Sequence, residues 1–357
     1  MRAVPASNSN SAMNPIEAYL DQIQQNLQTG QATEHTHRPA LQTLLQSLLP
    51  SVRALNEPRH IACGAPDYVI QRDAEPLGYI EAKDIDENLG NIQQSNQLKR
   101  YRQSLNNLIF TDYLEFRWFL EGEYKADLTV RLAEVDSKGH LNRFPENFPA
   151  LQTLLETFGA AQAIILRSPD ELAVKMAKIA DLLRDSIVRA YQQEDQDGKL
   201  HVQLESFRRV LLDYLMPEQF ADMYAQTICY GLFAAKCSAT GQAFSRMQAG
   251  YYVPKTNPFL RNLFNQIAGV DLDDRLVWIV EHLVAVLNRA DIAAILANFG
   301  KHTRQEDPVV HFYETFLAQY DPALREMRGV YYTPEPVVSY IVRSLDKVLR
   351  HSFGLKG

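Results

Sequence analysis

The sequence predicts an α/β domain, with a mixed central sheet flanked by helices, followed by an all-α domain. Up to about residue 160, short runs rich in apolar, β-branched and aromatic residues alternate with helical patterns, which is typical of a sheet covered by helices. After Pro169, apolar residues recur at helical spacing almost throughout. At 357 residues the chain is long enough for two to three domains.

The α/β part contains helices and strands in a mixed order. We expect a helix from about Pro39 to Leu55, strands around Asp67 and from Leu77 through Glu81, a helix through Gln97 and Tyr101, strands at Leu108–Thr111 and Tyr113–Leu120 around a tight turn, and a strand at Tyr124–Val135.

The remainder is predicted to be helical. The apolar stripes predict helices at Glu171–Glu194, Val202–Leu215, Phe220–Lys236, Asn257–Ala268, Leu276–Leu287, Ile292–Phe299 and Val337–Leu349. We therefore expect a flexible tail and lead-in at 1–32, an α/β domain at 33–160, a helical connector at 161–305 and the start of a third domain at 306–357.

Charge and cysteine content narrow the class of protein. The net charge of -7 and the pI near 5.8 do not indicate a strongly basic nucleic-acid binder, so any such contact must come from a local cluster. The three cysteines, Cys63, Cys229 and Cys237, form no C-x-x-C pair, which argues against a disulfide framework or a zinc site. No apolar run reaches the length of a membrane span, and we expect a cytoplasmic protein with no membrane partner.

Two acidic residues and a lysine form the most informative motif. Asp67 follows Pro66 in one apolar run, and Glu81 and Lys83 flank Ala82 in the next. Alternation along a strand places Glu81 and Lys83 on one face and Ala82 on the other. An isolated E-x-K is more often a solvated pair and an isolated Pro-Asp a turn, so the argument depends on their order, spacing and strand context.

These residue types fit chemistry at a divalent cation. Mg²⁺ or Mn²⁺ takes oxygen ligands, so Asp67, Glu81 and the backbone carbonyl of Ala82 are candidate metal ligands. Such a cation activates a bound water and stabilises charge on a phosphodiester. Lys83 is expected to position or deprotonate that water, or to neutralise developing charge.

Gln97 and Tyr101 complete the pattern, because a spacing of four residues places both on one helix face. With the preceding motif they resemble the PD-(D/E)xK nuclease core with its QxxxY element, found in RecB-type nucleases and in single-chain restriction-modification enzymes. The resemblance implies a magnesium-dependent endonuclease acting on double-stranded DNA, with Gln97 and Tyr101 supporting the active site. Lys99, Arg100 and Arg102 are then candidate DNA contacts, although a solvated helix face explains them equally well.

Residues upstream of this motif extend the candidate site. Glu34 lies at or just before the first turn of the predicted helix, and nucleases of this type often bring such a glutamate to the metal. A favourable interaction with the helix dipole explains Glu34 equally well. His35 and His37 lack a third ligand nearby, so we interpret both as structural or phosphate-facing.

A second resemblance lies near the C-terminal end. The stretch from Asp307 to Val338 includes Tyr332-Thr333-Pro334 and resembles the entry into the adenine-specific methyltransferase domain of single-polypeptide restriction-modification enzymes. There this turn contacts S-adenosylmethionine. Thr333 and Pro334 also suit the start of a helix that binds no ligand. The glycine-rich loop and the Asn-Pro-Pro-aromatic motif of such domains are missing, so no methyltransferase activity is expected from these residues alone.

The two resemblances predict an N-terminal fragment of a type I-like or type II-like restriction endonuclease, acting against foreign DNA. Its methyltransferase and target-recognition parts would be supplied in cis or in trans. Two alternatives remain: a RecB-like nuclease of repair or recombination, and a catalytically silent module that couples nuclease and methyltransferase parts.

Overall fold

The computed structural model describes residues 14–56, 65–73, 75–85, 87–161, 165–210, 212–239, 244–252, 264, 267–299, 308–322 and 335–354. The chain divides into two compact units. The first comprises Met1–Ala163, Arg189–Val202 and Asp273–Ala285, and the second comprises Ile164–Val188, Gln203–Leu272 and Val286–Gly357.

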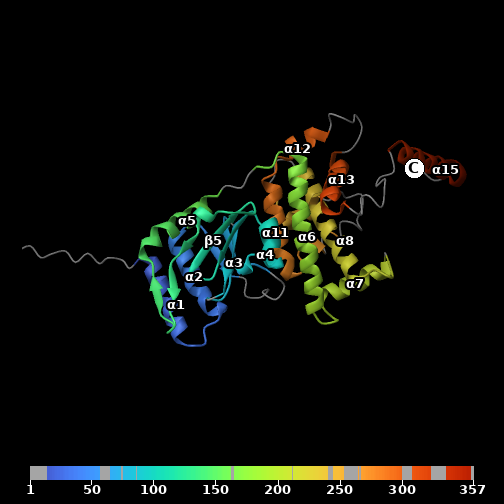
Figure 1. Cartoon of the computed structure of the whole chain (residues 1–357). Coiled ribbons are helices and arrows are strands. Elements are labelled where there is room, and N and C mark those ends of the chain that lie inside the picture. The colour runs from blue at the N-terminus through green and yellow to red at the C-terminus, as the bar shows by residue number, and fades with distance from the viewer. Residues whose placement is uncertain are drawn as a thin grey trace, which may run out of the picture. The chain divides into compact units, whose positions relative to one another are not determined.

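A mixed sheet forms the centre of the first unit (Figure 1). Its strands are β1 (Arg53–Asn56), β2 (Tyr68–Arg72), β3 (Glu75–Ala82), β4 (Asn107–Thr111), β5 (Glu115–Leu120), β6 (Glu123–Tyr124) and β7 (Val130–Arg131). The order is β1-β2-β3-β4-β5-β6, with β7 also paired to β5. β3 and β4 are parallel and the other pairs are antiparallel. The predicted α/β class with a mixed sheet is therefore confirmed.

Short helices make the crossover between the two parallel strands. They are α3 (Leu89–Ile92) and α4 (Asn96–Ser104). The Ser95 side chain accepts a hydrogen bond from the Leu98 amide and so caps α4. This crossover carries Gln97 and Tyr101 back over the strand that contains Glu81, because a parallel connection must return to the same end of the sheet.

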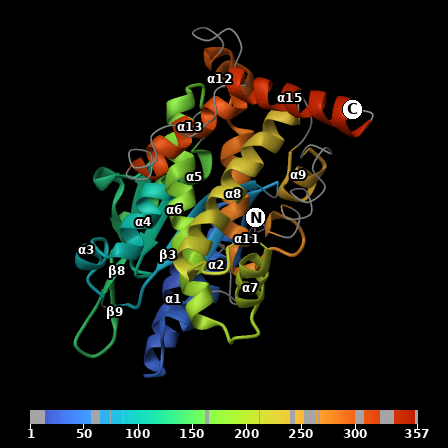
Figure 2. The ribbon, with the colours of Figure 1, turned by 90° about the vertical axis from the view of Figure 1, so that its right-hand side faces the viewer.

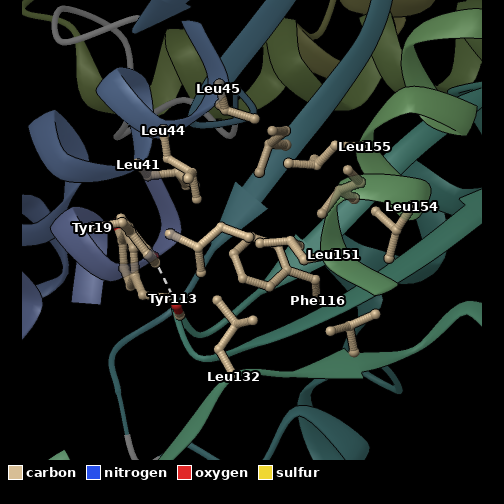
Figure 3. Close-up of a cluster of buried hydrophobic side chains, with 14 of the residues drawn as sticks. Tyr19, Leu41, Leu44, Leu45, Tyr113, Phe116, Leu132, Leu151, Leu154 and Leu155 are labelled. Atoms are coloured by element: carbon tan, nitrogen blue, oxygen red, sulfur yellow. Dashed lines mark hydrogen bonds between the residues drawn. The ribbon is translucent and has the colours of Figure 1, made fainter. Parts of the chain in front are cut away.

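Three longer helices cover the sheet: α1 (Pro15–Gln28), α2 (Glu34–Leu48) and α5 (Phe148–Ala160). Their apolar stripes enclose one core with residues of the sheet (Figure 3). Leu41, Leu44 and Leu45 of α2 lie near Leu151, Leu154 and Leu155 of α5, with Phe116 of β5 among them. The Tyr19 hydroxyl donates to the carbonyl of Tyr113 at 2.6 Å.

The structure corrects three expectations in this unit. Residues 15–28 of the expected tail form α1, which buries Ile16, Tyr19, Leu20 and Ile23. The helix expected to end at Leu55 ends at Leu48, because Arg53–Asn56 pairs with β2 as β1. The strand expected at Tyr124–Val135 is broken by a 3-10 turn, Ala126–Leu128. Beyond it lie β7 and then β8 (Ala133–Val135), which pairs with β9 (Leu141–Arg143) in a separate hairpin.

The rest of the described chain is helical, as predicted. Its helices are α6 (Pro169–Gln193), α7 (Lys199–Val210), α8 (Pro217–Ser238), α9 (Arg246–Tyr252), α11 (Asp274–Asn288), α12 (Ile292–Phe299), α13 (Pro308–Tyr320) and α15 (Glu335–Phe353). Helices α8 and α13 belong to the second unit (Figure 2). Phe233 of α8 stacks on Phe312 of α13, with ring centroids 3.9 Å apart. Most of the helix expected at Asn257–Ala268 lies outside the described residues. None of the helices in the described ranges is long and apolar enough to cross a membrane.

Candidate active site

Asp67 and Glu81 lie opposite each other where β2 begins and β3 ends. The antiparallel pairing sets Tyr68 against Ile80, so one further step sets Asp67 against Glu81. The backbone amide of Ala82 donates to Oδ2 of Asp67 at 2.7 Å. Both acids are buried, with 4% and 3% of their surfaces exposed. Two carboxylates from neighbouring strands thus share one face of the sheet.

Lys83 is hydrogen-bonded to one member of this pair, Glu81. Its Nζ donates to Oε1 of Glu81 at 2.7 Å, so the two side chains share a face, as strand alternation predicts. Ala82 between them packs in the apolar core on the opposite face. The lysine side chain is 23% exposed, which leaves its ammonium in reach of a bound molecule.

Gln97 supports the same glutamate. Its Nε2 lies 3.2 Å from Oε1 of Glu81 and 3.3 Å from the hydroxyl of Tyr101. Tyr101 is buried on the inner face of α4. The structure therefore brings together the five residues of the predicted catalytic set, with Glu81 at their centre.

Burial shifts the proton affinities of both acids. Burial, and then the charge of Asp67, raise the pKa of Glu81 to about 8. Burial also raises the pKa of Asp67, although the Ala82 amide and Arg38 partly offset it. Burial alone would lower the pKa of Lys83, but the Glu81 carboxylate outweighs it and the net shift is upward. Lys83 therefore stays charged at neutral pH.

One oxygen of Glu81 fits a cation ligand. Oε2 of Glu81 is buried and has no hydrogen-bond partner, which is costly for a carboxylate. A hard divalent cation between this oxygen and Asp67 would satisfy it. In the part of the chain that the structure describes, no three His, Cys, Asp or Glu side chains are grouped as a metal site. Asp67 and Glu81 are the two carboxylates that face each other here, and a metal bound to them remains a prediction.

Glu34 lies close to this pair, and an arginine separates it from Asp67. Glu34 is in the first turn of α2, and Nη2 of Arg38 donates to its Oε1 at 2.8 Å and also to Oδ1 of Asp67. Arg38 was not predicted from the sequence to lie in this site. Its spacing of four residues from Glu34 was the available signal.

The histidines of α2 have different environments. His37 is buried, its ring centroid lies 5.2 Å from that of Tyr113, and burial lowers its pKa. Of the two interpretations offered from the sequence, structural or phosphate-facing, the buried position of His37 fits the structural one. His35 is exposed.

A segment distant in sequence packs against β3 and α4. Within the first unit, His282 Nδ1 lies 2.9 Å from the hydroxyl of Tyr79, and His282 Nε2 lies 3.1 Å from the carbonyl of Ser104. Trp278 packs edge-on against Tyr79 and Tyr101, with centroids 6.0 and 6.2 Å apart. Residues 273–285 thereby support both β3 and α4, a contact that local sequence patterns did not reveal.

The candidate DNA contacts differ in exposure. Lys99 is exposed on α4, and Arg100 and Arg102 are partly buried. The Arg102 guanidinium lies 4.8 Å from the ring centroid of Phe119 and its Nη2 donates to the Gly122 carbonyl. Arg102 thus has a packing role, while a DNA contact by any of the three remains a prediction.

A polar cavity opens near the end of β4, the strand next to β3. It has a volume of about 450 Å³, and its lining includes Asp112, Glu115, Arg117 and Arg131. Asp112 follows β4, and the parallel pairing of Ala82 with Thr111 makes it the neighbour of Lys83. Glu115 accepts hydrogen bonds from both arginines, which lower its pKa against the effect of burial. This cluster was not predicted from the sequence, because it combines Glu115 and Arg117 of β5 with Asp112, which follows β4, and Arg131 of β7.

The candidate S-adenosylmethionine contacts, Tyr332, Thr333 and Pro334, lie outside the described residues. Helix α15 begins directly after them, at Glu335. Their role therefore remains a prediction.

Comparison with known proteins gives little further information. No protein-family model and no curated protein matches the chain. One similar solved structure is a cryo-EM structure of a DrdV–DNA complex, with 19% sequence identity and a TM-score of 0.33 over 96% of this chain and 32% of that one. The chain thus spans about a third of that protein's length.

Proposed function

We propose that this chain is a divalent-metal-dependent DNA endonuclease whose active site contains Asp67, Glu81 and Lys83. The observation that carries the proposal is the pair of opposed, buried carboxylates with a lysine ammonium 2.7 Å from one of them. Burying two acidic groups side by side costs stability, because each must be protonated or neutralised by a cation. The resemblance of the three motifs to PD-(D/E)xK nucleases favours DNA as the substrate.

The chain's own residues have distinct parts in this reaction. Asp67 and Glu81 would hold Mg²⁺ or Mn²⁺, with Glu34 and the Ala82 carbonyl as further oxygen ligands. When bound, such a cation activates water and stabilises charge on the phosphate. Because Lys83 stays protonated, its role is to neutralise developing negative charge rather than to accept a proton. Gln97 fixes the orientation of Glu81, and Tyr101 fixes Gln97.

The wider context of the enzyme is part of the same proposal. The motif ending in Tyr332, Thr333 and Pro334 favours a restriction-modification enzyme over a repair nuclease, because repair nucleases have no need of an S-adenosylmethionine site. Target recognition and methylation would then depend on further protein parts.

Cleavage of supercoiled plasmid tests the function. The purified chain with Mg²⁺ or Mn²⁺ is expected to convert supercoiled DNA to nicked or linear forms. Asp67→Ala and Lys83→Ala are each expected to abolish the conversion. Lys138→Ala, which changes an exposed lysine in the β8–β9 hairpin, is the matched control and should cleave like wild type.

Unchanged cleavage in both active-site variants would contradict the assignment. Metal-bound wild-type protein that cleaves neither plasmid nor single-stranded DNA would favour the silent coupling module.

A further inference from the structure

Arg38 occupies the position between two candidate metal ligands. The side chain is only 4% exposed, and its Nη2 donates to Oε1 of Glu34 at 2.8 Å and to Oδ1 of Asp67. The second oxygen of Asp67 already accepts from the Ala82 amide. Oδ1 is the oxygen of Asp67 that the backbone leaves open to a cation, and it is also the oxygen that Arg38 contacts.

The backbone around Arg38 is anchored to the sheet. The Tyr68 hydroxyl donates to the carbonyl of Arg38 and the Tyr113 hydroxyl donates to the carbonyl of Glu34, both at 2.7 Å. Both tyrosines are fully buried. The first turn of α2 is thus fixed, and only the long arginine side chain is left to move.

The Arg38 guanidinium contacts the two carboxylates without forming a bidentate pair with either. A single nitrogen, Nη2, makes both contacts to the carboxylates, and the buried Nε has no hydrogen-bond partner. An arginine bound for its fork geometry would present two parallel donors to one carboxylate. A doubly charged cation can therefore replace this contact without the loss of a bidentate pair.

We propose that Arg38 is an exchangeable internal counter-ion, which neutralises Glu34 and Asp67 in the metal-free protein and releases them to a divalent cation. Arg38 thereby competes with the metal and lowers its affinity, and its release makes Glu34 available as a third carboxylate ligand. This inference rests on the proposed metal-dependent function.

Direct metal binding tests the inference without any measurement of activity. Titration of the full chain with Mn²⁺, followed by calorimetry or by the electron spin resonance of free Mn²⁺, gives the dissociation constant. Arg38→Gln is expected to bind Mn²⁺ about tenfold more tightly than wild type. Arg38→Lys, whose ammonium cannot span both carboxylates equally well, is expected to lie between the two.

Arg143→Gln serves as the matched control, because Arg143 also forms an ion pair with an aspartate, Asp21, but a solvent-accessible one. It should bind Mn²⁺ like wild type. Thermal unfolding adds a second readout: Arg38→Gln should have a lower Tm than wild type without metal, and Mn²⁺ should raise its Tm by more.

The outcomes separate the two proposals. Wild type that binds Mn²⁺ while Arg38→Gln binds it equally or more weakly overturns the counter-ion role and leaves the nuclease proposal intact. No Mn²⁺ binding by wild type or by any variant overturns both proposals. If Arg38→Gln does not fold, the comparison of Arg38→Lys with wild type decides in the same way.

Discussion

The backbone amide of Ala82 donates a 2.7 Å hydrogen bond to Oδ2 of Asp67, so the acid that precedes β2 is fixed by the strand that carries Glu81. Asp67 lies outside the regular span of β2, where a carboxylate without such a contact would turn toward solvent. The hydrogen bond keeps the two carboxylates together on one face. Where both acids are ionised, they repel each other.

Burial of Glu81, and then its repulsion by Asp67, make stability depend on pH. The carboxyl of Glu81 has an ordinary pKa of 4.5, which rises to about 8 in the folded protein. Between these values the folded state binds more protons than the unfolded state. The contribution of Glu81 to the free energy of unfolding therefore falls as pH rises through this window and stays constant above it.

Glu81→Gln removes this titration. We expect the free energy of unfolding of metal-free wild type, relative to Glu81→Gln, to decrease between about pH 5 and about pH 8. Urea unfolding of both proteins across this range measures the difference. Glu146→Gln, a change at an exposed position, should leave the slope as in wild type. If the free energy of unfolding changed with pH in the same way for wild type and Glu81→Gln, the pKa of Glu81 would not be raised in the folded protein.

The contact between Gln97 and Glu81 predicts a loss of activity on substitution. Gln97→Ala removes a donor to Oε1 of Glu81 and should reduce the cleavage rate about tenfold or more, because residues that orient metal ligands typically have effects of this size. Gln103→Ala changes an exposed glutamine of the same helix and should cleave at the wild-type rate. Equal cleavage rates for the two variants would show that Gln97 does not contribute to the active site.

Trp278 is expected to stabilise the first unit from a distant segment. It is 7% exposed and packs on Tyr79 and Tyr101. Trp278→Ala should lower the free energy of unfolding by about 3 kcal/mol, through lost packing and a residual cavity. Trp278→Phe keeps an aromatic ring and should cost less. A change under about 1 kcal/mol for Trp278→Ala in urea unfolding would show that this segment does not support the sheet.

Asn107 satisfies three buried groups between the sheet and α5. Its Nδ2 donates to the carbonyls of Leu77 and Phe158 at 3.0 and 3.1 Å, and its Oδ1 accepts from Nε1 of Trp118 at 2.7 Å. Asn107→Asp would turn a carboxylate oxygen toward two carbonyls and should destabilise the protein by about 3 kcal/mol. Asn142→Asp, at an exposed position of β9, is the control. Equal Tm values for the two variants would contradict this account.

Local periodicity predicted much of the site. Alternation along β3 placed Glu81 and Lys83 on one face, and helical spacing placed Gln97 beside Tyr101; both contacts are present. These relations depend only on the repeat of a strand or a helix. The pairing of Asp67 with Glu81 was expected from their order on adjacent strands.

The remaining features depend on contacts between distant segments. Arg38 is hydrogen-bonded to Asp67, which lies 29 positions away in the sequence, and His282 to Tyr79, which lies 203 positions away. The predicted end of helix α2 was wrong for a similar reason, because Arg53–Asn56 becomes a strand only by pairing with β2. Sheet pairing and helix docking overrode local patterns at these positions.

Binding of Mn²⁺ to wild type and to Glu81→Gln tests the central claim most directly, since that claim assigns a divalent cation to the Asp67–Glu81 pair. The substitution replaces the buried carboxylate whose Oε2 has no hydrogen-bond partner with a neutral amide of nearly equal size. We predict one Mn²⁺ site in wild type that is lost, or weakened by about a hundredfold, in the variant. Coinciding isotherms for the two proteins would contradict the account.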